Sequence, residues 1–299
     1  MSWPVHIVKT SAQTKMEENL DPANSEKDLH FTLLIPAYNE EERIAGTLKE
    51  YAEHFRLNFS GCVKILVILN GCRDATLDVV HTWARRFPEI EVIEFKAPIG
   101  KGGALIEGLK LAPETDIIGY TDADGATPPD AMLSLLRKCY DHDGVIGSRW
   151  LPESKLHQAQ TLTRRFASRV FHRIVHTLFR LGFKDTQCPA KVFKKEAIVQ
   201  IHDGLMIADL AFDVNLLYLL KRNGFKVIEV GTEWTDKLGS KVTQTLFRSS
   251  LTMLLSVIRL RLVYSPFRNW MPYFRPVEAW IYKKLRAPLL TLPQETKSE

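Results

Sequence analysis

"GYTDADGATPPD", residues 119–130, places two carboxylates directly after an apolar run. This pattern indicates a buried strand with a polar site at its end. The run "DIIGYT" (116–121) is short and apolar, as a buried strand is. Asp122 and Asp124 follow it one residue apart, and Gly125 permits the chain to turn sharply. Because Mg²⁺ and Mn²⁺ prefer carboxylate oxygens, the stretch predicts a metal site at a strand end, with an exposed turn as the alternative.

The preceding part of the chain alternates strands with helices. "FTLLIP" (31–36), "VKILVIL" (63–69) and "IEVIEFK" (90–96) are apolar runs typical of strands, and a helical pattern follows each of them. We expect Asn39 to cap the first helix. The alternation predicts an α/β fold with a mostly parallel sheet flanked by helices. Such sheets bind ligands beyond the carboxyl ends of their strands, where four loops should converge: residues 36–40, 70–74, 100–103 and 122–124.

The composition is that of an ordinary globular protein. Of 299 residues, 45% are hydrophobic and 25% are charged, and the net charge is +5. The four cysteines form no C-x-x-C pair, which favours reduced thiols over disulfides or a zinc site. Residues 1–29 lack the continuous apolar segment of a signal peptide and are expected to be a flexible lead-in. A membrane-spanning helix needs a run of about 18 uncharged apolar residues, and the sequence contains no such run, so none is expected.

A strongly basic region follows the predicted sheet strands. Residues 155–195 contain ten lysines and arginines but a single acid, Asp185. Within them, residues 162–183 have the pattern of an amphipathic helix in which Arg165, Arg169 and Arg173 share a face. Arginine binds phosphate through paired hydrogen bonds, so this face predicts contact with an anionic ligand. An ordinary solvated helix face is the alternative.

Another amphipathic helix is expected over residues 243–262, where the charged residues are all arginines. An apolar face with a basic edge is typical of helices that lie at a membrane interface. Burial in the core or in a dimer interface is the alternative. The region after Pro288 is expected to be loose.

Nine short motifs occur in an order that resembles one enzyme family. They are "LLIPAYNEEERI", "ILNGCRDAT", "GKGGALIEGLKLA", "TDADGAT", "GSRW", "RRFASRVFH", "KDTQCPAKVF", "FDVNLLYLL" and "GSKV", between about Phe31 and Val242. This set resembles the family 2 glycosyltransferases, and within them the branch that makes polyprenyl-phosphate sugars. It is most similar to the dolichyl-phosphate β-glucosyltransferases and next to the dolichyl-phosphate mannose synthases. The resemblance implies a GT-A fold over residues 30–242, followed by interfacial helices and a tail over residues 243–299.

The resemblance also implies roles for particular residues. The nucleotide sugar would be bound by Pro36, Tyr38, Glu40, Asn70 and Asp122. Lys101 is a further candidate from the residues themselves, because the glycines around it let backbone N–H groups at a helix start approach a phosphate; a solvated lysine is the alternative. Asp122 and Asp124 would hold Mg²⁺ or Mn²⁺. The acceptor phosphate would be met by Arg149, Arg164 or Arg165, and Lys241. From the residues themselves, Asp185, Asp213 and Gln187 are the candidates for catalytic groups. The alternatives are a local salt bridge for Asp185, a structural role for Asp213 and a structural amide for Gln187.

Two departures from the family pattern concern the site. Asn70-Gly71-Cys72-Arg73 replaces the usual Asp-Asp-Gly-Ser, so an amide stands about where an acid often reads the base of the nucleotide. An amide can accept a hydrogen bond there but carries no charge. Pro189 replaces a glycine in "DTQCPAK", which removes a backbone donor and stiffens the loop.

These observations predict an inverting, metal-dependent glycosyltransferase. It would move a hexose, expected to be glucose from UDP-glucose, to polyprenyl phosphate at the cytosolic face of a membrane. Transfer from GDP-mannose, transfer to a soluble hydroxyl acceptor, and a sugar-nucleotide-binding protein without activity are the alternatives. The predicted partners are the nucleotide sugar, the lipid phosphate, a membrane surface and a possible second copy of the chain, and no nucleic acid.

Overall fold

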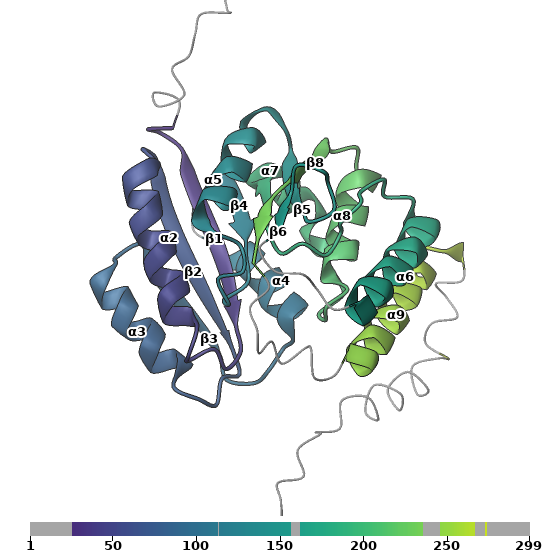
Figure 1. The fold of residues 1–299 in the computed structure, drawn as a ribbon, viewed down its shortest axis with the longest axis horizontal. Helices are drawn as coiled ribbons and strands as arrows, with labels where there is room; N and C mark the ends of the chain where they lie inside the picture. Colours follow the sequence, from purple (N-terminus) through teal and green to yellow (C-terminus); the bar gives the residue numbers. More distant parts are fainter. Residues whose placement is uncertain (1–25, 113, 157–161, 236–245, 267–272, 274–299) are drawn as a thin grey trace, which may run out of the picture.

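The computed structural model describes residues 26–112, 114–156, 162–235, 246–266 and 273. A seven-stranded sheet forms the centre, in the order β3-β2-β1-β4-β7-β5-β8, and helices cover both of its faces (Figure 1). The predicted fold class, an α/β sheet flanked by helices, is confirmed. The lead-in predicted over residues 1–29 is structured at its end, because residues 26–29 are described and Glu26 is buried.

The first half of the sheet is parallel and matches the strands predicted from apolar runs. It consists of β1 (His30–Ala37), β2 (Cys62–Asn70), β3 (Ile90–Phe95) and β4 (Ile117–Tyr120). β1, β2 and β4 are buried on both faces along most of their length, which favours continuous apolar side chains, whereas the edge strand β3 is mostly half-buried. The carboxyl ends of β1, β2 and β4 therefore lie along one edge of the sheet, as predicted.

The second half contains the antiparallel strand of the sheet. β7 (Lys191–Lys194) lies between β4 and β5 (Gly144–Ser148) and runs antiparallel to both, while β8 (Val227–Gly231) is parallel to β5. The two-residue strands β6 (Lys155–Leu156) and β9 (Glu233–Trp234) form a separate parallel pair. Neither β5 nor β7 was predicted, because each has only a few apolar residues.

Two hydrophobic clusters cover the two faces of the sheet. One includes side chains from α2 (Ile44–Asn58), α3 (Thr76–Arg86) and α5 (Pro129–Lys138). The other includes side chains from five helices: α4 (Lys101–Leu111), α6 (Leu162–Phe179), α7 (Lys195–Ile201), α8 (Phe212–Arg222) and α9 (Leu246–Val263). The short 3₁₀ turns η1 (Cys139–Asp141) and η2 (His202–Gly204) complete the described elements.

The helices α6 and α9 lie side by side at one end of the molecule (Figure 1). Val257 and Leu260 of α9 are buried in the same cluster as Val175 of α6. Ile258 and Leu262 of α9 remain exposed. The helix predicted over residues 243–262 is therefore partly buried, and one side of it faces solvent. Among the described helices, none combines the length and apolar character needed to cross a bilayer.

Candidate active site

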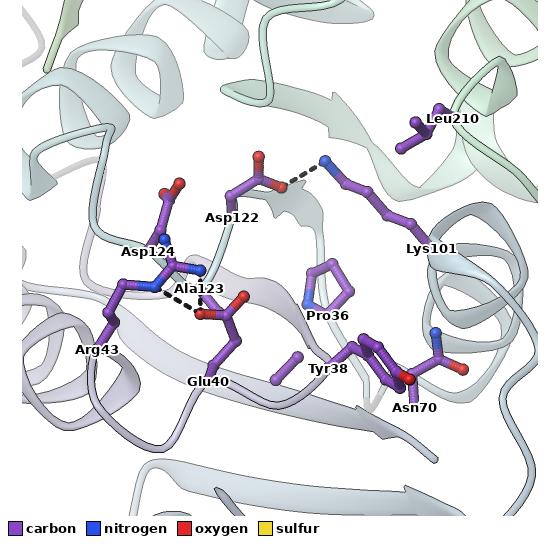
Figure 2. A pocket seen from close by; sticks show the side chains of 11 residues that line it. Pro36, Tyr38, Glu40, Arg43, Asn70, Lys101, Asp122, Ala123, Asp124 and Leu210 are labelled. Atoms are coloured by element: carbon purple, nitrogen blue, oxygen red, sulfur yellow. Dashed lines mark hydrogen bonds and ion pairs between the residues drawn. The ribbon is translucent and has the colours of Figure 1, made fainter. Parts of the chain in front are cut away.

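The predicted loops converge on one cavity of about 240 Å³ at the carboxyl edge of the sheet (Figure 2). Seven residues predicted from the sequence line it: Pro36, Tyr38, Glu40, Asn70, Lys101, Asp122 and Asp124. Ala37, Arg43, Ala123 and Leu210 complete the lining. The strands and helices that carry the predicted residues thus bring them together, although the role of each side chain remains a prediction.

Asp122 forms an ion pair with Lys101 across the cavity (Figure 2). Burial alone would lower the pKa of Lys101, but the negative charges of Asp122 and Asp213 raise it above its ordinary value. Lys101 is therefore a fixed positive charge beside the first carboxylate of the pair. A phosphate bound here would meet an ammonium group that is already in place.

The surroundings of Asp124 disfavour its charged form, whereas those of Lys101 favour the charged form. Burial raises the pKa of its carboxyl group, and the neighbouring charge of Asp122 raises it further. Its Oδ1 accepts a hydrogen bond from the Ala126 N–H at 3.0 Å, in a turn where Gly125 has a φ of +67°. Among the described residues, no third carboxylate, thiol or imidazole joins them in a metal-binding group. Two crowded carboxylates fit a hard divalent cation whose remaining ligands come from a diphosphate or water.

Glu40 and Arg43 form a second ion pair in the cavity. The Nε and Nη2 of Arg43 donate to Oε2 of Glu40 at 2.7 and 2.5 Å. The Nη1 of Arg43 is buried and has no hydrogen-bond partner in the described residues. Sequence reasoning missed Arg43, although its place three residues after Glu40 could have suggested that the two share a site. Arg43 thus adds a guanidinium charge to the cavity wall, where it is paired with Glu40.

Asn39 joins two of the loops and does not cap α2, as the sequence had suggested. Its φ is +54°, and its Oδ1 accepts the Arg73 N–H at 2.8 Å. The helix begins only at Ile44, after a turn, so Asn39 is too far from the first helical N–H groups. This contact ties the loop after β1 to the loop after β2.

Asn70 also holds a loop. Its side chain is 6% exposed, and its Oδ1 accepts the Ile99 N–H at 2.7 Å. The amide oxygen is therefore engaged with the loop before α4. A base-reading role, which remains a prediction, would fall to the amide NH₂ group.

The glycines at 100–103 accommodate a neighbouring loop. The Gly103 N–H donates to the carbonyl oxygen of Ala208 at 3.0 Å. A Cβ placed on Gly100 would lie 2.3 Å from that same oxygen, and Gly100 has a φ of +83°. These glycines had suggested backbone contacts to a phosphate. In the structure, they let the loop before α8 lie directly against the start of α4.

Replacing Gly102 with alanine is expected to lower the unfolding free energy by about 2 kcal/mol or more. The new Cβ would lie 2.6 Å from the Ile207 carbonyl oxygen and 2.7 Å from that of Asp209. Gly46→Ala is the matched control, because nothing lies within 4 Å of its Cβ position in α2. It should stabilise the protein by about 1 kcal/mol. Urea unfolding of both variants measures the difference, and equal stabilities would contradict this packing.

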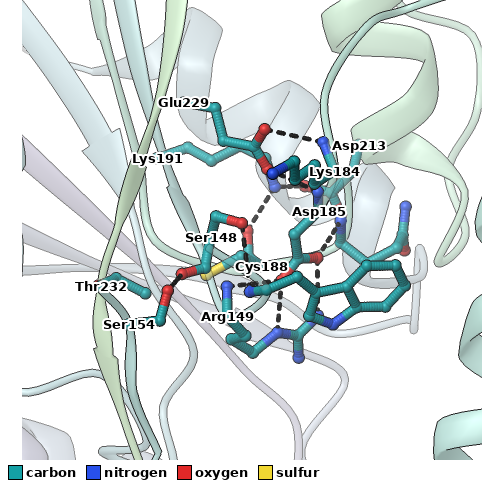
Figure 3. Close-up of polar contacts among 12 residues, drawn as sticks. Ser148, Arg149, Ser154, Lys184, Asp185, Cys188, Lys191, Asp213, Glu229 and Thr232 are labelled. Atoms are coloured by element: carbon teal, nitrogen blue, oxygen red, sulfur yellow. Dashed lines mark hydrogen bonds and ion pairs between the residues drawn. The ribbon is translucent and has the colours of Figure 1, made fainter. Parts of the chain in front are cut away.

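A second polar cluster contains Arg149, Asp185, Lys191 and Asp213 (Figure 3). The Nε and Nη2 of Arg149 donate to the two oxygens of Asp185 at 2.7 and 3.0 Å. Burial alone would raise the pKa of Asp185, but the charge and hydrogen bonds of Arg149 hold it below its ordinary value. The backbone N–H of Asp185 donates to Glu229 of β8 at 2.6 Å. Asp185 is thus an ionised partner of Arg149, which is the salt-bridge alternative considered from the sequence.

Asp213 belongs to a buried network that the sequence did not reveal. Its Oδ1 accepts hydrogen bonds from the Tyr120 hydroxyl and from Nζ of Lys191, both at 2.5 Å. Lys191 is fully buried and also donates to the Cys188 carbonyl oxygen at 2.5 Å. Tyr120 ends β4, two residues before Asp122. The network therefore joins β4, β7 and α8 directly beneath the paired carboxylates.

The remaining predicted residues are placed less completely. The backbone N–H of Gln187 donates to Asp185 at 3.1 Å, and its buried Nε2 has no hydrogen-bond partner in the described residues. Arg164 and Arg165 lie in α6, in the part whose side chains are not described. Lys241 lies outside the described residues. Their contact with an acceptor phosphate stays a prediction.

Comparison with known proteins agrees with this geometry. The model of glycosyl transferase family 2 matches residues 32–201, which include all the predicted cavity residues. The chain belongs to glycosyltransferase family 2. Among this family's curated members, the dolichyl-phosphate β-glucosyltransferase of Dictyostelium discoideum is 31% identical over 269 residues, covering 86% of this chain and 81% of that protein. That of Drosophila melanogaster is 30% identical and covers 80% and 74%.

Solved structures show the fold that this family 2 glycosyltransferase shares. Glucosyl-3-phosphoglycerate synthase from Mycobacterium tuberculosis, solved with Mn²⁺, UDP and glucosyl-3-phosphoglycerate, matches with a TM-score of 0.61. The match covers 82% of this chain and 84% of that chain at 14% identity. Mannosyl-3-phosphoglycerate synthase from Rubrobacter xylanophilus matches with a TM-score of 0.56 at 19% identity, covering 81% and 79%. At these identities the likeness concerns the fold alone, and it supports the predicted GT-A architecture.

Proposed function

We propose that this glycosyltransferase moves glucose from UDP-glucose to dolichyl phosphate, with inversion at the anomeric carbon. The observation that carries the proposal is the cavity that gathers Asp122, Asp124 and Lys101 at the carboxyl edge of the sheet. The curated relatives that match four-fifths of the chain or more are named dolichyl-phosphate β-glucosyltransferases, which supports this sugar and this acceptor.

The cavity suits a diphosphate leaving group. Asp122 and Asp124 would hold Mg²⁺ or Mn²⁺, and a divalent cation bound there would neutralise charge that develops on the departing nucleotide. Lys101 and Arg43 supply fixed positive charges on the walls of the same cavity. The Mn²⁺ and UDP found with one structural neighbour are consistent with such a site.

The candidate bases favour an acceptor that is already ionised. Arg149 engages both oxygens of Asp185 and holds its pKa low, so this carboxylate is a weak proton acceptor. Asp213 already accepts two hydrogen bonds at 2.5 Å. A hydroxyl acceptor would need a base to remove its proton. A phosphate monoester has a second pKa of about 6 and is largely ionised at neutral pH, so it needs positioning rather than a base.

The α6–α9 pair is where we propose that the enzyme meets a membrane. Val170 of α6 and Ile258 and Leu262 of α9 are exposed, and basic residues such as Arg169 and Arg261 are exposed on the same two helices. Apolar side chains with neighbouring arginines suit the interface of an anionic bilayer. Peripheral binding at the cytosolic face would bring the lipid acceptor to the catalytic domain.

A panel of donors and acceptors tests the proposal. UDP-glucose, UDP-galactose and GDP-mannose would each be supplied with Mn²⁺ and with dolichyl phosphate in liposomes or 3-phosphoglycerate in solution. We expect a glucosylated lipid from UDP-glucose, identified by mass. A mannosylated lipid from GDP-mannose alone would overturn the donor assignment. Product on 3-phosphoglycerate alone would overturn the acceptor, and no product from any pair would favour a binding protein.

A further inference from the structure

The loop of residues 204–211, called here the 204–211 loop, contributes to the donor cavity although it lies beyond the match to the family model. Leu210 lines the cavity near Lys101 (Figure 2). The carbonyl oxygen of Ala208 accepts the Gly103 N–H at 3.0 Å, in the first turn of α4. Lys101 is the first residue of that turn. The position of this loop therefore sets the position of the start of α4, and with it the ammonium group that pairs with Asp122.

The C-terminal helix α9 holds the 204–211 loop at two points. The hydroxyl of Ser256 donates a hydrogen bond to Oδ2 of Asp209. Just after the end of α9, the hydroxyl of Tyr264 donates to the Gly204 carbonyl oxygen at 3.1 Å. Ser256 is fully buried and Asp209 is half-buried, so the contact is partly shielded from water. Hydrogen bonds to a charged acceptor are stronger than those between neutral groups.

The rest of the loop is held by its own Asp209 and by Asn215 of α8. Oδ1 of Asp209 accepts the Ala211 N–H at 2.8 Å, and Oδ1 of buried Asn215 accepts the Met206 and Ile207 N–H groups at 2.8 and 3.2 Å. These bonds leave Ala208 and Leu210 on either side of Asp209, the residue that Ser256 contacts. A shift at Asp209 would be transmitted to Ala208, which contacts α4, and to Leu210, which lines the cavity.

We propose that Ser256 is a positioning residue for nucleotide-sugar binding. Its hydrogen bond to Asp209 fixes the 204–211 loop, and the loop fixes Lys101 and Leu210 in the cavity. The inference rests on the proposed function, because it takes the cavity to be the donor site. Since α9 is one of the two helices that we propose to meet a membrane, the same contact links the lipid-facing side of the enzyme to its donor cavity.

Ser256→Ala tests the inference, with Ser265→Ala as the matched control. The Ser265 hydroxyl donates at 2.7 Å to the Leu262 carbonyl oxygen, three residues earlier in the chain and outside the 204–211 loop. Ser256→Ala should raise the donor KM and the Kd of UDP with Mn²⁺ by about 3- to 10-fold, the effect of one lost hydrogen bond. The kcat should change less than twofold, and Ser265→Ala should match the wild type in all three.

A double variant separates positioning from a general loss of stability. If Ser256 acts through Asp209, then Asp209→Ala/Ser256→Ala should raise the donor KM no further than Asp209→Ala does. Additive increases in KM, or an unchanged KM in Ser256→Ala, would overturn the inference.

Amide hydrogen exchange provides a readout that needs no ligand. Ser256→Ala should speed exchange in residues 204–211 and at Gly103, whose N–H is bonded to the loop. Exchange identical to that of Ser265→Ala would overturn the inference whatever the donor is. If instead the exchange responds as expected but the wild type transfers no glucose from UDP-glucose, the proposed function fails and the link between α9 and the cavity stands.

Discussion

Asp124→Asn is expected to lower kcat/KM for transfer by about 10²–10³-fold, the loss that follows removal of one group stabilising a developing charge. The asparagine keeps the size of the side chain and an oxygen that can accept the Ala126 N–H. What it removes is the negative charge that would help to hold the divalent cation. Steady-state kinetics with UDP-glucose and dolichyl phosphate measure the effect.

The same substitution is expected to stabilise the metal-free protein slightly. Burial and the charge of Asp122 raise the pKa of the Asp124 carboxyl. At a pH above that pKa, the ionised carboxylate therefore lowers the stability of the folded protein. A neutral amide at this position would relieve that cost, and the Tm of the variant in EDTA should equal or exceed that of the wild type. Asp203→Asn is the control, since that side chain is fully exposed and should change neither Tm nor activity. Activity of Asp124→Asn within tenfold of the wild type would contradict the assignment.

Lys191→Met is expected to lower the unfolding free energy by about 3–5 kcal/mol. The ammonium group of Lys191 is fully buried and pairs with Asp213, whose side chain is 9% exposed. Methionine has a similar length but leaves the carboxylate of Asp213 without a cation in a poorly hydrated place. Urea unfolding followed by circular dichroism measures the loss. Activity should fall with it, because the charge of Asp213 acts on Lys101 and Tyr120 ends the strand that precedes Asp122.

An exposed ion pair provides the comparison. Lys64 and Glu91 are 37% and 38% exposed, so Lys64→Met should change the unfolding free energy by no more than about 1 kcal/mol. The double variant Lys191→Met/Asp213→Asn removes both buried charges and should recover part of the loss. If Lys191→Met lowered the unfolding free energy no more than Lys64→Met does, the buried ion pair would not stabilise the fold as described.

Most of the parallel half of the sheet was predictable because β1, β2 and β4 are largely buried on both faces and therefore have nearly continuous apolar sequences. The cavity followed from the same reasoning, since parallel strands end at one edge and the polar residues after them must gather there. Asp122, Asp124, Glu40 and Lys101 were found in this way. The metal and the acceptor contacts remain proposals.

The residues that were missed depend on contacts between distant parts of the chain. Lys191 stands in "PAKVF", where nothing local indicates that its charge is buried against Asp213 of a later helix. Leu210 reaches the cavity only because the 204–211 loop crosses the start of α4. Asn39 has the identity of a helix cap, yet its φ of +54° makes it a connection between two loops. Residue type and spacing do not encode such pairings.

The antiparallel strand β7 has a consequence for synthesis of the chain on the ribosome. Once Tyr120 has left the ribosome, β1 to β4 can pair, but the free edge of β4 awaits the emergence of β7, which ends at Lys194. At about 5–20 residues per second, that wait lasts on the order of ten seconds. During it, the backbone edge of β4 is open to pairing with other nascent chains. Conditions that slow elongation between β4 and β7 should therefore lower soluble yield more than equal slowing after Lys194.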